Sequence, residues 1–443
     1  MAPALTVENG AASTAKKIAD RPTALLHRTP WRPPVASSAD GIYITLEDGR
    51  TVIDAVGGAA VSCIGNGHPV VKQALKDQVD KVSYVYSMQL SNEPAEELAE
   101  YLVKSSNGAF SLVGFSSGGS EAMESVIKLS RQYFYDTKQP QRKNFISRNL
   151  SFHGNTVGTL SLSGHPARRA PYEAVLNNNV FHHVSPAYAK RFQKPDETEE
   201  QYVERLRQEL EDKFLELGPD TVIGFVAETV VGATTGCVAA PKGYFKAMKS
   251  VCRKYGALFI LDEVMSGMGR MGTLHAWESF GDGEAPDMQA VAKGLGGGQS
   301  HPLACAAALA VQKVVASENL LENCCTQGAY LGQLLRERLQ APNALAAPYA
   351  FDVRGGGSFW AVEFDFAGAS VDFKGKQFAM IVQARCLENG LVVMGLTGGA
   401  NLEGTKGDHI IFAPAYNVTK EQVEKIVDVF VENVEAVLRE SLV

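Results

Sequence analysis

The sequence predicts an α/β protein built on a mainly parallel β-sheet. Two strongly apolar runs of strand length, 221–227 and 257–261, end directly at Glu228 and at Asp262. Between them, residues 243–255 carry apolar side chains at helical spacing. A strand, an amphipathic helix and a second strand in this order are typical of a βαβ unit in a buried parallel sheet. Ligands of such sheets bind beyond the carboxyl ends of the strands, where both acidic residues fall.

Shorter elements are predicted before this unit. The run GIYITLEDGRTVIDAV (41–56) predicts two short strands joined by a turn at Asp48-Gly49. One helix is expected after Pro69 and another after Asn92, because apolar residues then recur at helical spacing. Residues 1–35 show no sustained period, so we expect an arm that is either disordered or ordered against a partner subunit.

The last hundred residues change in character and predict a smaller α+β domain. Val353–Glu363 is glycine-rich and then strand-like. The chain closes with an amphipathic helix that Thr419 and Gln422 open as a capping box. The predicted division of the chain is an N-terminal arm (1–35), the first part of the small domain (36–80), the large domain (81–325) and the C-terminal part of the small domain (326–443).

Composition excludes several classes of protein. The 443 residues include 42 Lys and Arg against 49 Asp and Glu, so no basic surplus exists for nucleic acid or an anionic membrane. No apolar run approaches the length of a transmembrane helix, and the first residues lack a signal-peptide core. The seven cysteines show no CxxC spacing, which predicts reduced thiols and no zinc site. We therefore expect a cytoplasmic protein without a metal.

Two residues of the large domain suggest covalent chemistry. Lys293 lies between an apolar run and a glycine-rich segment, although a surface lysine after a strand is the commoner interpretation. Asp262, at a strand end, would need a cationic partner if it is buried, and a protonated pyridine nitrogen would be one. A structural or helix-capping aspartate is the alternative.

Two further motifs suggest a phosphate and an aromatic ligand. Ser116–Glu121 (SSGGSE) precedes an amphipathic helix, whose free N–H groups and dipole would bind phosphate, or it is a plain N-cap. Phe152 could stack on an aromatic ligand, or it is a core residue. Together, an amine, an acid, a phosphate cradle and a stacking ring are what pyridoxal phosphate needs.

The same residues resemble a known family. The run LFILDEVMSGMGRMGTLHAWESFGDGEAPDMQAVAKGLGGG (258–298) resembles the signature of the class III aminotransferases, which are pyridoxal-phosphate enzymes of fold type I. FSSGGSEAMES, SFHG, AETVVGATTG and GDHIIFAPAYNVTKEQV follow in the family's order, so the resemblance covers nearly the whole chain. The last of these looks most like the ω-amino acid and amine aminotransferases.

The resemblance implies roles for individual residues. Lys293 would be the catalytic residue, joining the cofactor as an imine and carrying the proton. Asp262 would pair with the pyridine nitrogen, while Val264 and Phe152 would pack on opposite faces of the ring. The full cofactor-binding set implied is Gly119, Ser120, Phe152, Glu228, Asp262, Val264 and Lys293.

Some positions depart from the family pattern. Phe152 stands where tyrosine is usual, and Thr229 replaces the proline after Glu228. Ile411 occupies the position where relatives acting on α-carboxylates often carry arginine. Lys406 could meet a carboxylate instead, but an exposed lysine is the commoner case. Arg354 either binds substrate or bridges the two domains.

The chain is also shorter than the family pattern after Lys293. Gly298 runs through Gln299 and Ser300 directly into His301. The family has at this point a strand and then a loop, whose threonine reaches the cofactor phosphate of the neighbouring subunit. This segment is deleted from the sequence. A gene-model error, a splice form and a diverged, inactive protein are three alternative explanations.

The resemblance implies a function as well. We expect an aminotransferase that moves an amino group from an amine or ω-amino acid to a 2-oxo acid or aldehyde. It would work by a ping-pong mechanism, as a homodimer. Other chemistry on the same cofactor (aminomutase, racemase or decarboxylase) and a relative impaired by the deletion remain the alternatives.

Overall fold

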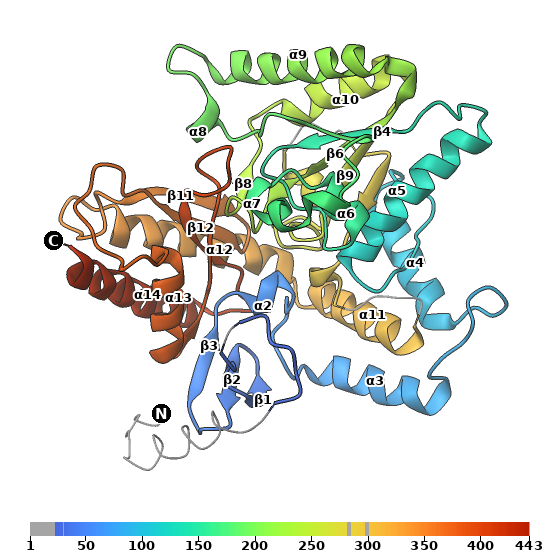
Figure 1. Cartoon of the computed structure of the whole chain (residues 1–443). Helices are drawn as coiled ribbons and strands as arrows, with labels where there is room; N and C mark the ends of the chain where they lie inside the picture. Colours follow the sequence, from blue (N-terminus) through green and yellow to red (C-terminus); the bar gives the residue numbers. More distant parts are fainter. Residues whose placement is uncertain (1–22, 30, 281–284, 297–300, 443) are drawn as a thin grey trace.

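A computed structural model describes residues 23–29, 31–280, 285–296 and 301–442 (Figure 1). Its central sheet has five strands in the order β10-β9-β6-β4-β5, and every neighbouring pair is parallel. The predicted βαβ unit and the α/β fold class are thereby confirmed. The strands are β4 (Asn144–Arg148), β5 (Phe181–Val184), β6 (Val222–Glu228), β9 (Leu258–Asp262) and β10 (Met288–Ala290).

Helices cover both faces of this sheet, which is why β6 and β9 are apolar along almost their whole length. On one face, α9 (Glu199–Leu217) and α10 (Tyr244–Lys254) bury a cluster that includes Phe225 and Phe259. On the other face, α5 (Gly119–Asp136) and α6 (Val157–Leu162) bury one that includes Val226 and Ile260. Residues adjacent in each strand therefore serve opposite faces.

Among the described residues, three further sheets lie outside the central one. The N-terminal strands β1 (Ala36–Asp40), β2 (Tyr43–Leu46) and β3 (Thr51–Asp54) continue into β13 (Leu391–Val392), so both ends of the chain share a sheet. A second sheet has the order β11-β12-β15-β14. Its strands are β11 (Ala350–Gly356), β12 (Phe359–Phe364), β15 (Asp408–Phe412) and β14 (Met394–Thr397). The short strands β7 (Val230–Val231) and β8 (Val238–Ala239) pair with each other.

The remaining helices agree with the sequence signals where these were read. Asn92 caps α4, and Thr419 and Gln422 form the predicted capping box of α14. These helices are α3 (Pro69–Lys81), α4 (Glu93–Ser105), α11 (Pro302–Ser317), α12 (Leu320–Leu339), α13 (Phe378–Glu388) and α14 (Lys420–Ser441). Further short helices of three to six residues are α2 (Gly57–Ala60), α7 (Pro166–Arg169), α8 (Ala189–Phe192), η1 (Ala170–Val175), η2 (Pro219–Thr221), η3 (Ala276–Phe280) and η4 (Lys293–Leu295).

Helix length and thiol placement can be checked directly. Among the described residues, no single helix is both long and apolar enough to cross a membrane. α11 and α12 have that length and composition only when taken together, and a bend of 72° separates them. Six of the seven cysteines are buried as free thiols and Cys325 is exposed, as predicted for small buried hydrophobes.

The deletion predicted after Lys293 falls at the edge of the central sheet. Residues 297–300 lie outside the described residues, and β10 is the last described strand on that side. Residues 111–117, which lead into α5, form no strand, and the Leu112 side chain is 89% exposed. No described strand thus takes the place of the one that the family pattern has here.

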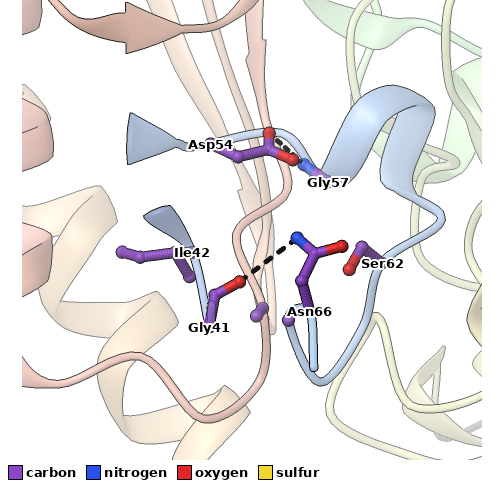
Figure 2. Close-up of a pocket in the computed structure, with 8 residues that line it drawn as sticks. Gly41, Ile42, Asp54, Gly57, Ser62 and Asn66 are labelled. Carbon is purple, nitrogen blue, oxygen red and sulfur yellow. Dashed lines mark hydrogen bonds between the residues drawn. The ribbon is translucent and has the colours of Figure 1, made fainter. Parts of the chain in front are cut away.

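A small crevice lies beside the N-terminal strands (Figure 2). It has no enclosed space for even a water molecule, and its polar groups bond to one another. The Asn66 side chain donates to the Gly41 carbonyl, and an Asp54 oxygen accepts from the N–H of Gly57. Because these groups are already paired, the crevice is a packing feature and not a binding site.

A buried charge cluster joins the first residues of α8 to the β11–β12 hairpin. Glu363 is fully buried and accepts hydrogen bonds from Tyr188 and Arg191. Arg354 pairs with the second oxygen of Glu363 at 2.8 Å. Arg354 also donates to Tyr188 and to the carbonyls of Thr235 and Gly236. Of the two roles open from the sequence, the structure therefore supports the bridge.

Replacing Glu363 should be costly because two guanidinium groups would lose their buried counter-charge. We expect Glu363→Gln to lower the free energy of unfolding by about 3 kcal/mol, measured by chemical denaturation. Asp428→Asn is the control, because its ion pair with Arg338 is exposed and should contribute less than about 1 kcal/mol. Equal losses in the two variants would contradict the assignment.

Candidate active site

The candidate site lies at the carboxyl edge of the central sheet. The parallel register of β6 and β9 sets Glu228 directly beside Asp262, and that of β10 sets Ala290 on the other side of Asp262. Lys293 follows β10 by three residues. The pairing of strands thus brings two acidic side chains and one amine to the same edge, as the sequence predicted.

Asp262 is held in place by two hydrogen bonds. Its carboxylate accepts from the Val264 N–H at 3.0 Å, and its other oxygen lies 2.9 Å from Nδ1 of His153. Both side chains are buried, and Nε2 of His153 has no hydrogen-bond partner among the described residues. Asp262 therefore keeps unused lone pairs, which a protonated ring nitrogen would fill.

Glu228 ties the strand end to the neighbouring loops. It accepts from the N–H of Phe152 at 2.9 Å and from that of Gly232 at 3.1 Å. Burial raises the pKa of Glu228, and the charge of His153 and these two N–H groups partly oppose that rise. Glu228 thus fixes the backbone that carries Phe152.

The environment of Lys293 favours a neutral amine. Burial lowers the pKa of Lys293, while the charges of Asp262 and Glu228 oppose this effect and Arg270 adds to it. A neutral amine is the nucleophilic form. The backbone of Lys293 has φ +45°, a left-handed conformation that a non-glycine residue rarely adopts and that is frequent at functional sites.

The phosphate cradle predicted at Ser116–Glu121 is the start of α5. No side chain caps this helix, so its first N–H groups are available to an anion. The hydroxyl of Ser120 accepts from the Asn155 N–H at 3.0 Å and can still donate. A Cβ on Gly119 would lie 2.6 Å from Cγ1 of Val264, so this position has no room for a side chain.

These contacts connect the predicted site residues into one cluster. Gly119 packs against Val264, and the N–H of Phe152 donates to Glu228. Lys293 follows the strand that pairs with that of Asp262, and the charges of Asp262 and Glu228 raise its pKa against the effect of burial. The cluster offers an amine, a carboxylate with free lone pairs and uncapped helix N–H groups. These groups fit pyridoxal phosphate, since its aldehyde, ring nitrogen and phosphate need one of each.

Two contacts of the site were missed from the sequence. Nothing in the sequence around His153 indicates Asp262, 109 residues away, as its hydrogen-bond partner. The second contact is that of Thr229, which stands where the family pattern has proline. Its N–H donates to the Asp262 carbonyl at 3.1 Å, and its hydroxyl donates to Glu263 at 2.9 Å. Proline could make neither bond.

Glu263, next to Asp262, is a structural acid. Besides the Thr229 hydroxyl, its carboxylate accepts from the N–H groups of Ala276 and Trp277 and from the side chain of Gln289. Burial raises its pKa to about 7, against the effect of these donors. All its partners are protein groups, so it anchors the segment after β9.

The structure shows the surroundings of the three residues that the sequence analysis considered for binding a substrate carboxylate. Ile411 is buried within β15, in a cluster with Phe359 and Ala361. Arg354 is committed to the charge cluster around Glu363, and Lys406 is exposed. None of the three is placed to contact a substrate carboxylate.

Comparison with known proteins agrees with this geometry. A family model described as Aminotransferase class-III matches residues 29–301 and 299–434. An uncharacterized aminotransferase of Schizosaccharomyces pombe is 41% identical over 429 residues, which cover 90% of this chain and 91% of the relative. Gamma aminobutyrate transaminase 3 of Solanum lycopersicum is 28% identical over 442 residues, covering 91% and 81%.

A solved structure shares the whole fold. The omega transaminase from Pseudomonas jessenii in complex with PMP superposes with a TM-score of 0.84 at 26% identity, covering 96% of this chain and 98% of that one. The strand-end acids, the lysine and the uncapped helix therefore stand in the framework of a known enzyme family. The chain belongs to the class III aminotransferases, which use pyridoxal phosphate.

Proposed function

We propose that this aminotransferase takes amines or ω-amino acids as donors and 2-oxo acids or aldehydes as acceptors, in a ping-pong reaction with Lys293 as the catalytic residue. The observation that carries the proposal is the cluster at the sheet edge: Glu228 lies beside Asp262, and Lys293 follows the strand on the other side of Asp262. The relatives support it, since one is named a gamma aminobutyrate transaminase and another an omega transaminase.

When bound, pyridoxal phosphate supplies an aldehyde that links to amines and a ring that accepts electrons. The amine of Lys293 would bind that aldehyde and later move a proton to and from the substrate Cα. Its lowered pKa suits both tasks, because a neutral amine can attack and accept a proton.

The other site residues would bind and orient the cofactor. Asp262 would keep the ring nitrogen protonated, with His153 and the Val264 N–H holding its carboxylate in position. The first N–H groups of α5, at Gly119 and Ser120, would bind the phosphate. Phe152 and Val264 would enclose the ring and exclude water from it.

Two further expectations belong to this proposal. The enzyme would act as a homodimer, as the family resemblance implies, and it would be cytoplasmic. The domain division given above likewise remains a prediction.

Removal of the Lys293 amine should abolish covalent attachment of the cofactor. After borohydride reduction of the pyridoxal-phosphate-loaded proteins, mass spectrometry should find the added cofactor mass on wild type and none on Lys293→Ala. Lys313→Ala is the control, since this lysine is exposed and pairs with Glu97. Attachment that persists in Lys293→Ala would refute the role of Lys293.

Without the His153 imidazole, the Asp262 carboxylate should lose the hydrogen bond that orients it. We expect His153→Ala to lower kcat by about 10- to 100-fold, as for a lost charge-assisted hydrogen bond. His153→Asn should recover part of this loss, because its amide can donate at the position of Nδ1. An unchanged kcat in His153→Ala, or equal losses in both variants, would argue against a positioning role.

The deletion after Lys293 should weaken cofactor binding. The family model matches in two pieces that meet at residues 299–301, which supports a deletion at this point. We expect equilibrium titration to give a higher Kd for pyridoxal phosphate in this chain than in a relative that carries this strand and loop, because phosphate donors from the neighbouring subunit would be missing. Equal affinities would contradict this, and a purified chain without transaminase activity would favour the impaired-relative alternative.

A further inference from the structure

We propose that Arg168 binds the substrate carboxylate in this enzyme, so that ω-amino acids and 2-oxo acids are preferred over uncharged amines and aldehydes. The inference rests on the proposed function, because it assigns the substrate class of that same site. Neither position considered above can bind that carboxylate. Ile411 is apolar and buried, and the guanidinium of Arg354 is already paired with Glu363.

Arg168 lies at the wall of the candidate site. It belongs to α7, and its guanidinium carbon lies 5.2 Å from the centre of the Phe152 ring. One nitrogen donates to the carbonyl of Ala233 at 3.3 Å, in the loop that follows Glu228 and β7. The guanidinium therefore sits between the ring expected to stack on the cofactor and the loop beyond Glu228.

The charge of Arg168 is not neutralised by the protein. Among the described residues, no carboxylate lies within ion-pair distance of it, and its guanidinium donates a hydrogen bond only to the Ala233 carbonyl. Burial lowers the pKa of Arg168, the charge of Glu228 partly opposes this, and Arg28 adds to it. A half-buried cation without a counter-ion has a desolvation cost, and a bound carboxylate would offset that cost.

Arg169, the next residue of α7, is hydrogen-bonded as expected for an arginine with a structural role. Arg169 donates to the carbonyls of Ser161 and Ser163 and to the side chains of Asn178 and Glu173. These bonds account for its charge and fasten α7 to α6. The two adjacent arginines therefore have different tasks, and only Arg168 keeps donors for a ligand.

An unpartnered histidine and a second cation also lie near Arg168. His165, at the start of α7, is buried with both ring nitrogens unpartnered. Burial and the charge of Arg168 lower the pKa of His165 to about 4, so it is neutral at physiological pH. Arg28, from the N-terminal segment, adds a second positive charge nearby. The local field thus favours a negatively charged ligand, and Arg presents the fork that a carboxylate fits.

A matched pair of donors tests the proposal. β-Alanine and propylamine share an amine and a two-carbon chain, but only β-alanine ends in a carboxylate. With the pyridoxal-phosphate-loaded enzyme, the half-reaction of each donor is followed from the cofactor spectrum. We expect Arg168→Ala to lower the ratio of kcat/KM for β-alanine to that for propylamine by about 10- to 100-fold. Arg168→Lys should fall between, because lysine lacks the bidentate fork.

Binding is measured separately, so that it does not depend on turnover. Calorimetry of the same loaded proteins with propionate should give a Kd at least about 10-fold higher in Arg168→Ala than in wild type. Lys406→Ala is the matched control for removal of one positive charge, since this lysine is exposed, and should bind propionate as wild type does.

The two measurements separate the possible failures. An unchanged donor ratio in Arg168→Ala, equal propionate affinity in wild type and Arg168→Ala, or no measurable propionate binding to either would overturn the role of Arg168. Wild-type enzyme that reacts with neither donor nor with any other amine would instead overturn the proposed function. In that case, a difference in propionate affinity would still support Arg168 as a carboxylate-binding residue.

Discussion

The constraint on which the site depends is the side-by-side placement of two buried carboxylates. The register of β6 and β9 makes Glu228 and Asp262 neighbours at the end of the sheet. Two charges so close in a buried place repel each other, and each raises the cost of ionising the other. The fold offsets this with His153, Lys293 and backbone N–H groups. A protonated ring nitrogen would add the remaining positive charge, so the site is electrostatically complete only with its cofactor.

How much the sequence could reveal depends on the range of each interaction. The acids at the strand ends and the glycine-rich helix start were predictable, because hydrophobic patterning and chain polarity place them at one edge of a parallel sheet. The pairing of His153 with Asp262 was not, since it depends on how two distant loops pack. The role of Arg354 stayed open for the same reason, and only its contacts in three dimensions decide it.

The residue proposed to bind the substrate carboxylate lies on α7 and not on β15, where relatives often carry an arginine. Ile411 is buried in the β15 sheet, where a guanidinium would have to displace packed apolar side chains. A cation on α7 reaches the other side of the site, beside Phe152, without entering that core. The backbone of α7 is held by Arg169 through several carbonyls, which gives Arg168 a rigid base.

The position of Lys293 must be fixed at the outer end of the described part of the central sheet. β10 is the last described strand there, so no described strand beyond it braces the turn that follows. The bracing comes from buried side chains of other elements instead. Gln312 of α11 donates to the carbonyls of Gly294 and Leu295, and the Cys63 thiol contacts the Gly294 carbonyl. Because these contacts come from α11 and from the segment before α3, the strained backbone of Lys293 can persist without a strand partner.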